Sequence, residues 1–164
     1  SEAVVVNSFS KYFGMTGWRI GWLIVPESLV EVTTRLAQNL FISAPTVAQY
    51  AAVRAFDEDV LAVLEERRQA FRQRRDYLAG ELPGLGFRLP AVGAGAFYLY
   101  AGMGETDEHS EVFCRRVLDD HGVALTPGTD FSEFTGHDHV RFAYTTGMDE
   151  LERAVERLYR ATRR

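Results

Sequence analysis

Lys11 is the residue of this sequence with the clearest capacity for chemistry, because it is the only lysine among 18 basic side chains. All the other basic residues are arginine. A lysine ammonium can lose its proton and become a nucleophilic amine that condenses with a carbonyl, whereas arginine stays protonated. Lys11 follows an apolar run, in a polar loop whose burial we expect to favour the neutral amine. On composition alone, the chance survival of one surface lysine explains the pattern equally well.

Three other side chains of the same loop can bind an anion. Arg19 follows Lys11 by eight residues, and its planar guanidinium can bind a phosphate through two parallel hydrogen bonds. Ser8 can add a hydroxyl donor, and Ser10 is a weaker candidate for the same role. The structural alternatives are a surface salt bridge for Arg19 and a turn-stabilising role for Ser8.

A second pair of candidates lies nearer the C-terminus. Arg141 interrupts an apolar run over residues 140–143, where a charged side chain needs a partner. That partner is a carboxylate, either of a ligand or of an Asp or Glu of the protein itself. Phe97 either lines a pocket or belongs to the core. The four histidines have no spacing typical of metal ligands, so we expect no metal site.

Periodicity and turn signals predict the elements that position these residues. Two short β-branched runs, residues 3–6 and 20–25, predict buried strands on either side of the loop that holds Lys11. Helices are expected over 27–40, 46–56, 60–82 and 108–121, and from about 148 onward. Further strands are expected as a pair within 87–101, at 123–125 and at 140–143. This alternation predicts an α/β protein, with a domain boundary between Phe56 and Asp57.

The segment around Lys11 resembles a known family. Residues 8–22, SFSKYFGMTGWRIGW, are similar to the cofactor-lysine segment of the class I and II aminotransferases, the aspartate aminotransferase-like branch of the fold type I enzymes. Residues 140–146, VRFAYTT, are similar to the segment where that family places the arginine for the substrate carboxylate. The sequences GAFYLY and TPG follow in the expected order between the two segments, so the resemblance spans the whole chain.

The resemblance implies a fold and a domain organisation. The chain would be the C-terminal part of a fold type I transferase that depends on pyridoxal 5'-phosphate. Residues 1–56 would be the C-terminal remnant of the large cofactor-binding domain, and residues 57–164 the long interdomain helix with the small α/β domain. The family also implies a homodimer with active sites at the subunit interface.

The resemblance also implies a role for each candidate residue. Lys11 would form a Schiff base with pyridoxal 5'-phosphate, and Ser8, Ser10 and Arg19 would bind the cofactor. Arg141 would hold the substrate carboxylate, and Phe97 would line the substrate pocket. The reaction would move an amino group between an amino acid and a 2-oxo acid.

Composition narrows the function classes. A formal net charge of −5 argues against a nucleic-acid partner, and no apolar run is long enough to predict a membrane span. A single cysteine, Cys114, excludes an intrachain disulfide and fits a reducing cytoplasm. We expect the chain to be a fragment that lacks the family's upstream cofactor contacts, and therefore to be inactive alone.

Three other readings of the sequence stay open. A carbon–sulfur lyase or an aminocyclopropane-carboxylate synthase resembles aminotransferases around the lysine. A transcription regulator can carry an aminotransferase-like domain, although such domains tend to follow the lysine with Pro-x-Leu-Arg-x-Gly rather than GMTGWR. A degenerate homologue can serve as an interaction module, but the retention of Lys11, Arg19 and Arg141 together disfavours this. The amino donor and acceptor cannot be read from the sequence.

Overall fold

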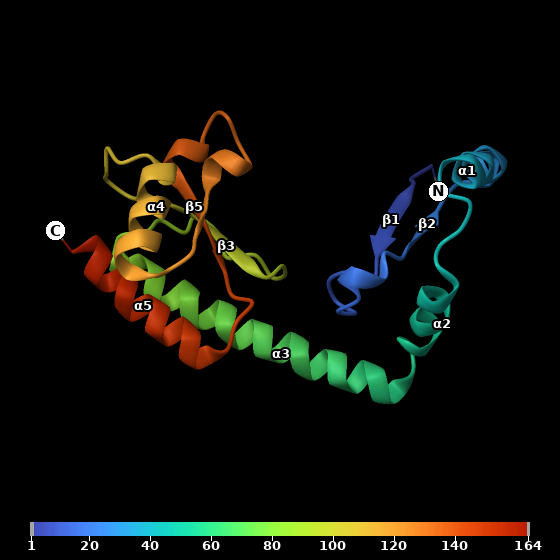
Figure 1. Cartoon of the computed structure of the whole chain (residues 1–164), viewed down its shortest axis with the longest axis horizontal. Helices are drawn as coiled ribbons and strands as arrows, with labels where there is room; N and C mark the ends of the chain where they lie inside the picture. The colour runs from blue at the N-terminus through green and yellow to red at the C-terminus, as the bar shows by residue number, and fades with distance from the viewer. Residues whose placement is uncertain (1, 164) are drawn as a thin grey trace. The chain divides into compact units, whose positions relative to one another are not determined.

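The computed structural model describes residues 2–163, which form two compact units. The first unit extends to Arg68 and the second begins at Gln69, so the division falls inside the long helix α3 (Glu58–Glu81). The domain boundary predicted from the sequence, between Phe56 and Asp57, lies just before this helix and stays a prediction. Figure 1 shows the helices and strands of both units.

The first unit is built on a two-stranded antiparallel sheet. Strands β1 (Val5–Ser8) and β2 (Gly21–Ile24) pair with Val5 opposite Ile24 and Ser8 opposite Gly21. Helices α1 (Glu27–Leu40) and α2 (Thr46–Arg54) follow, each preceded by a proline. Proline suits the start of a helix because the first backbone N–H groups there have no partner within the helix. The predicted helix over 27–40 is confirmed at both ends.

A small aromatic core fixes the connection between these strands. The buried residues are Phe9 and Met15 of the connection and Ala52 and Ala55 at the end of α2. The ring of Phe9 also lies 4.9 Å from that of Trp22 on β2, in an edge-on arrangement. The connection, which includes the short 3₁₀ turn Thr16–Trp18, is therefore held by side chains of its own.

The prediction that β1 and β2 are buried strands is wrong for the described residues. Val6 is 75% exposed and Ile24 is 59% exposed. Helix α1 has no buried residue, and Leu40 on its apolar face is 76% exposed. A β-branched run is buried only when a second layer covers it. Within residues 2–68, other side chains bury part of the connection between β1 and β2 but leave the strands themselves largely exposed.

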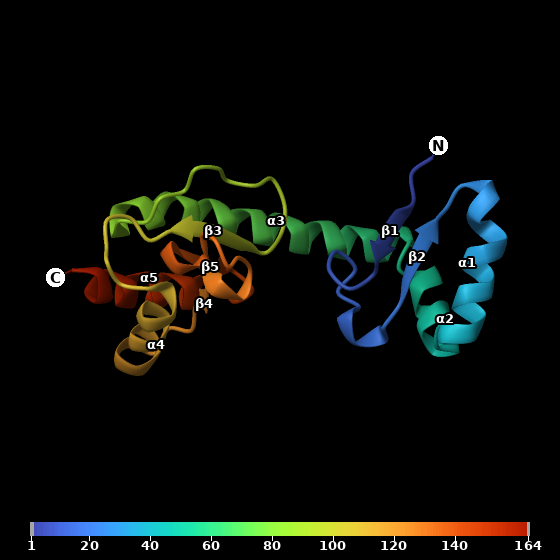
Figure 2. The same ribbon diagram turned by 90° about the horizontal axis from the view of Figure 1, so that it is seen from above.

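The second unit contains a three-stranded antiparallel sheet in the order β3-β5-β4. The strands are β3 (Tyr98–Gly102), β5 (His139–Ala143) and the very short β4 (Thr126–Pro127). Tyr100 and Thr126 both lie opposite Arg141, one on each side of β5. Helices α4 (Ser110–His121) and α5 (Met148–Thr162) complete the unit with the last turns of α3 (Figure 2). Three 3₁₀ turns span Leu82–Leu85, Gly128–Asp130 and Gly136–Asp138.

The two faces of this sheet differ in character. Because side chains alternate along a strand, Leu99 and Ala101 of β3 share a face with Val140 and Phe142 of β5. All four are buried, in one core with apolar residues of α3, α4 and α5. The opposite face carries polar and aromatic side chains that are not fully buried: Tyr98, Tyr100, His139 and Arg141. The helices therefore supply cover for one face, and the other is available for a site.

Two strand predictions in this unit need correction. Only an isolated bridge, Arg88 to Gly102, replaces the first strand of the pair expected within 87–101. Pro90 and the glycines at 93 and 95 follow it, and such residues weaken a paired strand. The strand expected at 123–125 lies at Thr126–Pro127 instead, because the N–H of Val123 donates to the carbonyl of Val117 and ends α4.

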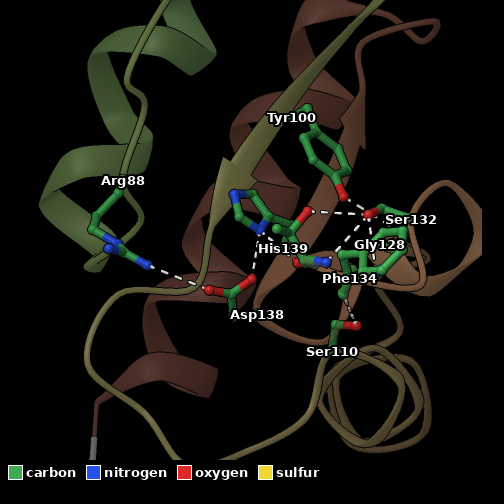
Figure 3. A network of polar contacts seen from close by, with 10 residues as sticks. Arg88, Tyr100, Ser110, Gly128, Ser132, Phe134, Asp138 and His139 are labelled. Carbon is green, nitrogen blue, oxygen red and sulfur yellow. Dashed lines mark hydrogen bonds and ion pairs between the residues drawn. The ribbon is translucent and has the colours of Figure 1, made fainter.

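The connection between β4 and β5 folds back on itself at two glycines. A Cβ built on Gly136 would lie 2.5 Å from the backbone of Gly128, closer than atoms can approach. The fully buried Ser110 hydroxyl donates to the Gly136 carbonyl at 2.7 Å. Figure 3 shows His139 beside Asp138; the His139 Nδ1 lies 2.6 Å from Asp138 Oδ1 and 2.8 Å from the Thr135 carbonyl. The connection is thus rigidly fixed to α4 and β5.

We predict that Gly136→Ala destabilises the chain. The added methyl must displace backbone, and overpacking of this kind costs about 1–3 kcal/mol. The matched control is Gly80→Ala, because Gly80 is exposed near the end of α3 and a Cβ there meets nothing within 4 Å. Alanine favours the helix, so this control should gain up to about 1 kcal/mol. Thermal unfolding of the two variants gives their melting temperatures. Equal melting temperatures would contradict the close approach of Gly136 to Gly128.

Candidate functional site

Lys11 lies in a tight turn within the connection between β1 and β2. The N–H of Gly14 donates to the Lys11 carbonyl at 3.0 Å, and Gly14 has a φ of +67°, which favours glycine. The neighbouring Phe9 and Phe13 rings lie 4.7 Å apart and anchor the turn in the small core. The expectation that Lys11 is buried is wrong for the described residues, where its side chain is exposed. Phe9 and Phe13 take the inner positions of this turn, and Lys11 between them stays exposed.

A chain of hydrogen bonds links the other candidates of this connection. The Ser8 hydroxyl accepts from the N–H of Ser10 at 3.1 Å. The Thr16 hydroxyl donates to the Ser10 carbonyl at 2.6 Å, and Arg19 Nη1 donates to the Thr16 carbonyl at 2.9 Å. Hydroxyls and a guanidinium are therefore gathered in one loop with Lys11. The sequence did not single out Thr16, whose contacts depend on how the loop closes.

The backbone of Arg19 adopts a conformation that is unusual for its residue type. Its φ and ψ are 53° and 50°, in the left-handed region. Residues with a Cβ are disfavoured there by about 1–2 kcal/mol. Such outliers cluster at functional sites, where a specific side chain must be held in place. The loop therefore keeps a strained arginine at a position where glycine would fit without strain.

Arg141 lies on the open face of the sheet in the second unit. Its Nη2 donates to the Thr126 hydroxyl at 3.0 Å. The guanidinium carbon lies 5.0 Å from the centre of the Phe131 ring and 5.5 Å from that of Tyr98. Among residues 2–163 no ion pair joins Arg141 to an Asp or Glu, so these residues do not supply the internal carboxylate partner that the sequence left open.

One donor of this guanidinium lacks an acceptor. The Nε atom of Arg141 is buried and has no hydrogen-bond partner within the described part of the chain. A buried, unsatisfied donor costs about 1–3 kcal/mol, and more when the group is charged. Proteins keep such a group where a ligand or another group meets it in the working state. A carboxylate is the acceptor that matches guanidinium geometry best.

Phe97 lies directly before β3, at the edge of the same sheet. Its ring packs partly against the core of the second unit and meets the Tyr98 ring edge-on at 5.4 Å. Its carbonyl accepts from the N–H of Tyr144 at 2.9 Å. The Tyr98 ring thus contacts both the Phe97 ring and the Arg141 guanidinium. A contact of Phe97 with a substrate stays a prediction.

The structure gathers the predicted residues into two groups. Ser8 at the end of β1 and Ser10, Lys11 and Arg19 in the connection after it lie in the first unit, whereas Phe97, directly before β3, and Arg141 on β5 lie in the second. The sequence missed Thr126, Tyr98 and Phe131 around Arg141. A signal for Tyr98 was its position two residues before Tyr100 on a strand, but the partner register of Thr126 is not visible in a sequence.

The described residues contain neither a metal-binding cluster nor a membrane-spanning helix. Within residues 2–163, no cluster of three or more His, Cys, Asp or Glu side chains is placed to hold a metal ion. No helix of the described chain has the length and apolar character to cross a membrane.

Comparison with known proteins gives a consistent match. The family described as "Aminotransferase class I and II" matches residues 1–158. The valine–pyruvate aminotransferase of Mycobacterium tuberculosis is 39% identical over 157 residues, which are 96% of this chain and 40% of that protein. The aspartate aminotransferase of Geobacillus stearothermophilus is 37% identical over 172 residues, covering 98% of this chain and 41% of that protein.

Solved structures agree with the sequence relatives. An aminotransferase from Mycobacterium tuberculosis superposes with a TM-score of 0.92 at 39% identity, over 96% of this chain and 41% of that one. An aromatic aminotransferase from Pyrococcus horikoshii gives a TM-score of 0.86 at 34% identity, over 96% and 42%. The chain thus spans about two fifths of the length of these relatives.

We predict that Arg19→Gly is more stable than Arg19→Ala by about 1 kcal/mol. Both variants lack the guanidinium and its bond to Thr16, but only glycine adopts the left-handed backbone without strain. Urea unfolding of the two variants in the intact protein checks the difference. Equal free energies of unfolding would show that position 19 carries no backbone strain.

Proposed function

Because the chain belongs to the class I and II aminotransferase family, we propose that its protein moves an amino group between an amino acid and a 2-oxo acid. Members of this family use pyridoxal 5'-phosphate. The observation that supports the proposal most is the loop in which the only lysine of the chain lies among hydroxyls and a strained arginine. The two relatives described above are named as aminotransferases, which favours transamination over the lyase and regulator alternatives.

The residues of this loop fit the chemical parts of the cofactor. A phosphate needs several donors, and Arg19 with the Ser8 and Ser10 hydroxyls supplies them. The Ser8 oxygen already accepts from the Ser10 N–H, so its own proton is left to donate. The aldehyde needs a primary amine, which Lys11 alone provides. When bound, pyridoxal phosphate supplies an electron sink for the carbanion formed at the substrate α-carbon.

The residues of this chain then have distinct roles. Lys11 would hold the cofactor through its Nζ, and its free amine would take the proton from the substrate α-carbon. Arg19, Ser8 and Ser10 hold the phosphate so that the reacting atoms stay in place. Arg141 binds the substrate carboxylate. Its buried Nε, which lacks an acceptor within residues 2–163, supports this role.

Three further features belong to the same proposal. Phe97 lines the substrate pocket beside Arg141, next to Tyr98. The protein works as a homodimer, as the resemblance to the family implies. It acts in the cytoplasm, where a lone thiol stays reduced. Burial, followed by the charge of Asp130, raises the pKa of Cys114 to about 12 and keeps it as an unreactive thiol.

We predict that Lys11→Arg abolishes transamination while it preserves the charge. A guanidinium forms no imine and takes no proton from the α-carbon, so turnover should fall by at least about 10²–10⁴-fold. The measurement is release of 2-oxo acid by the intact protein, with borohydride reduction to locate the attached cofactor. The control is Arg19→Lys, which weakens phosphate binding yet leaves the covalent attachment at position 11. Turnover by Lys11→Arg, or attachment elsewhere, would refute the proposal.

We predict that the 164-residue chain alone binds pyridoxal phosphate weakly and transaminates negligibly. The chain spans about two fifths of the length of its relatives, and Lys11 is exposed in the first unit. Titration of the cofactor absorbance against the chain and against the intact protein compares the two affinities. A donor and acceptor screen on the intact protein then identifies the substrates. Normal absorbance and turnover from the chain alone would contradict the expectation.

A further inference from the structure

We infer that Thr126 is a positioning residue that sets the orientation of the Arg141 guanidinium for carboxylate binding. This inference rests on the proposed function, because it names the residue through which Arg141 recognises its ligand. The observation behind it is the 3.0 Å hydrogen bond from Arg141 Nη2 to the Thr126 hydroxyl.

The contact follows from the register of the sheet. Thr126 on β4 and Arg141 on β5 are directly opposite each other in an antiparallel pair. Side chains in such a pair leave the same face of the sheet at close range. That face is the one turned away from the helical core, so both side chains lie where a ligand can meet them. Register alone therefore brings a hydroxyl to the guanidinium.

The aromatic neighbours leave one degree of freedom for Thr126 to fix. The Phe131 and Tyr98 rings lie 5.0 Å and 5.5 Å from the guanidinium carbon and attract the cation. This attraction holds the guanidinium near the rings, but it only weakly restricts rotation of the guanidinium within its own plane. The hydrogen bond at Nη2 supplies that direction. A β-branched threonine is suited to this role because few rotamers are open to it.

The backbone that carries Thr126 is itself fixed. Two residues after it, Gly128 packs against Gly136, at a distance that no Cβ would allow. The Gly128 carbonyl accepts from the N–H of Phe131 at 2.9 Å, and the Tyr100 hydroxyl reaches it at 3.5 Å (Figure 3). Strand β4 thus supplies the hydroxyl, and the connection directly after it supplies Phe131, one of the rings next to Arg141. A small change at Thr126 should act on Arg141 without loosening the loop.

The chemical consequence concerns which protons of Arg141 remain for a ligand. Thr126 occupies one proton of Nη2, which leaves the second Nη2 proton, both Nη1 protons and the Nε proton, which has no acceptor within residues 2–163. A carboxylate that binds through two parallel hydrogen bonds needs the remaining donors in a fixed plane. Losing the hydroxyl should therefore weaken carboxylate binding before it affects the reacting atoms. The expected signature is a change in KM with kcat preserved.

The test compares Thr126→Val with Thr126→Ser in the intact protein loaded with its cofactor. Valine keeps the shape and loses the hydroxyl, whereas serine keeps the hydroxyl and loses a methyl. For Thr126→Val we expect KM for the amino acid to rise about tenfold, the scale of a lost hydrogen bond to a charged group, with kcat within about twofold. Thr126→Ser should stay within about threefold of the wild type in KM, because it rescues the bond.

A second readout does not depend on turnover. Calorimetry gives the Kd of propanoate, a carboxylate without an amine, and this Kd should rise with KM in Thr126→Val. In an Arg141→Ala background, Thr126→Val should have no further effect, since the hydroxyl acts through the guanidinium. Equal Kd values for Thr126→Val and the wild type would overturn the inference, as would a Thr126→Ser variant that is as weak as Thr126→Val.

The two proposals fail in different ways. If the wild type binds propanoate through Arg141 but does not transaminate, the proposed function is wrong and the role of Thr126 is still decided by the Kd values. If the wild type transaminates and Thr126→Val changes neither KM nor Kd, only the positioning role is wrong.

Discussion

The alternation of side chains along β5 is the constraint on which the second unit depends. Val140 and Phe142 must enter the core formed with the three helices, so His139 and Arg141 must leave the sheet on the other face. A shift of one residue in register would bury the guanidinium among aliphatic side chains and expose the core. The hydrophobic effect that folds this unit thus also decides where its arginine is displayed. The five residues of β5 therefore determine both the packing of the core and the face of the sheet on which Arg141 lies.

In the first unit, the packing of a loop, and not the alternation along a strand, positions the candidate residue. Phe9 and Met15 enter the small core, and the residues between them are drawn into a turn that carries Lys11. Backbone strain at Arg19 and a hydrogen bond to Thr16 then direct the guanidinium back along the loop. Within residues 2–68 the small core covers part of this loop but leaves helix α1 without a buried residue, and the relatives are more than twice as long as the chain.

Much of this organisation could be predicted from the sequence. The helix over 27–40, the long helix and the strand that holds Arg141 follow from periodicity, and the candidate residues follow from residue type and spacing. Burial was mispredicted for β1, β2 and Lys11, because cover by other parts of a protein leaves no trace in local sequence. The strand expected at 123–125 does not form there, because the N–H of Val123 donates to the carbonyl of Val117 at the end of α4. The partners of Arg141 depend on the pairing of distant strands, which periodicity does not specify.

The exposure of the single lysine has a practical consequence for anyone who handles the protein. A protease that cleaves after lysine has one target within these 164 residues, the bond between Lys11 and Tyr12, and that target lies in a turn at the surface of the first unit. Blocking the amine removes this target, so the presence or absence of a single cut reports the chemical state of one nitrogen atom. Within these 164 residues, the bias toward arginine leaves no second lysine that could give another cut.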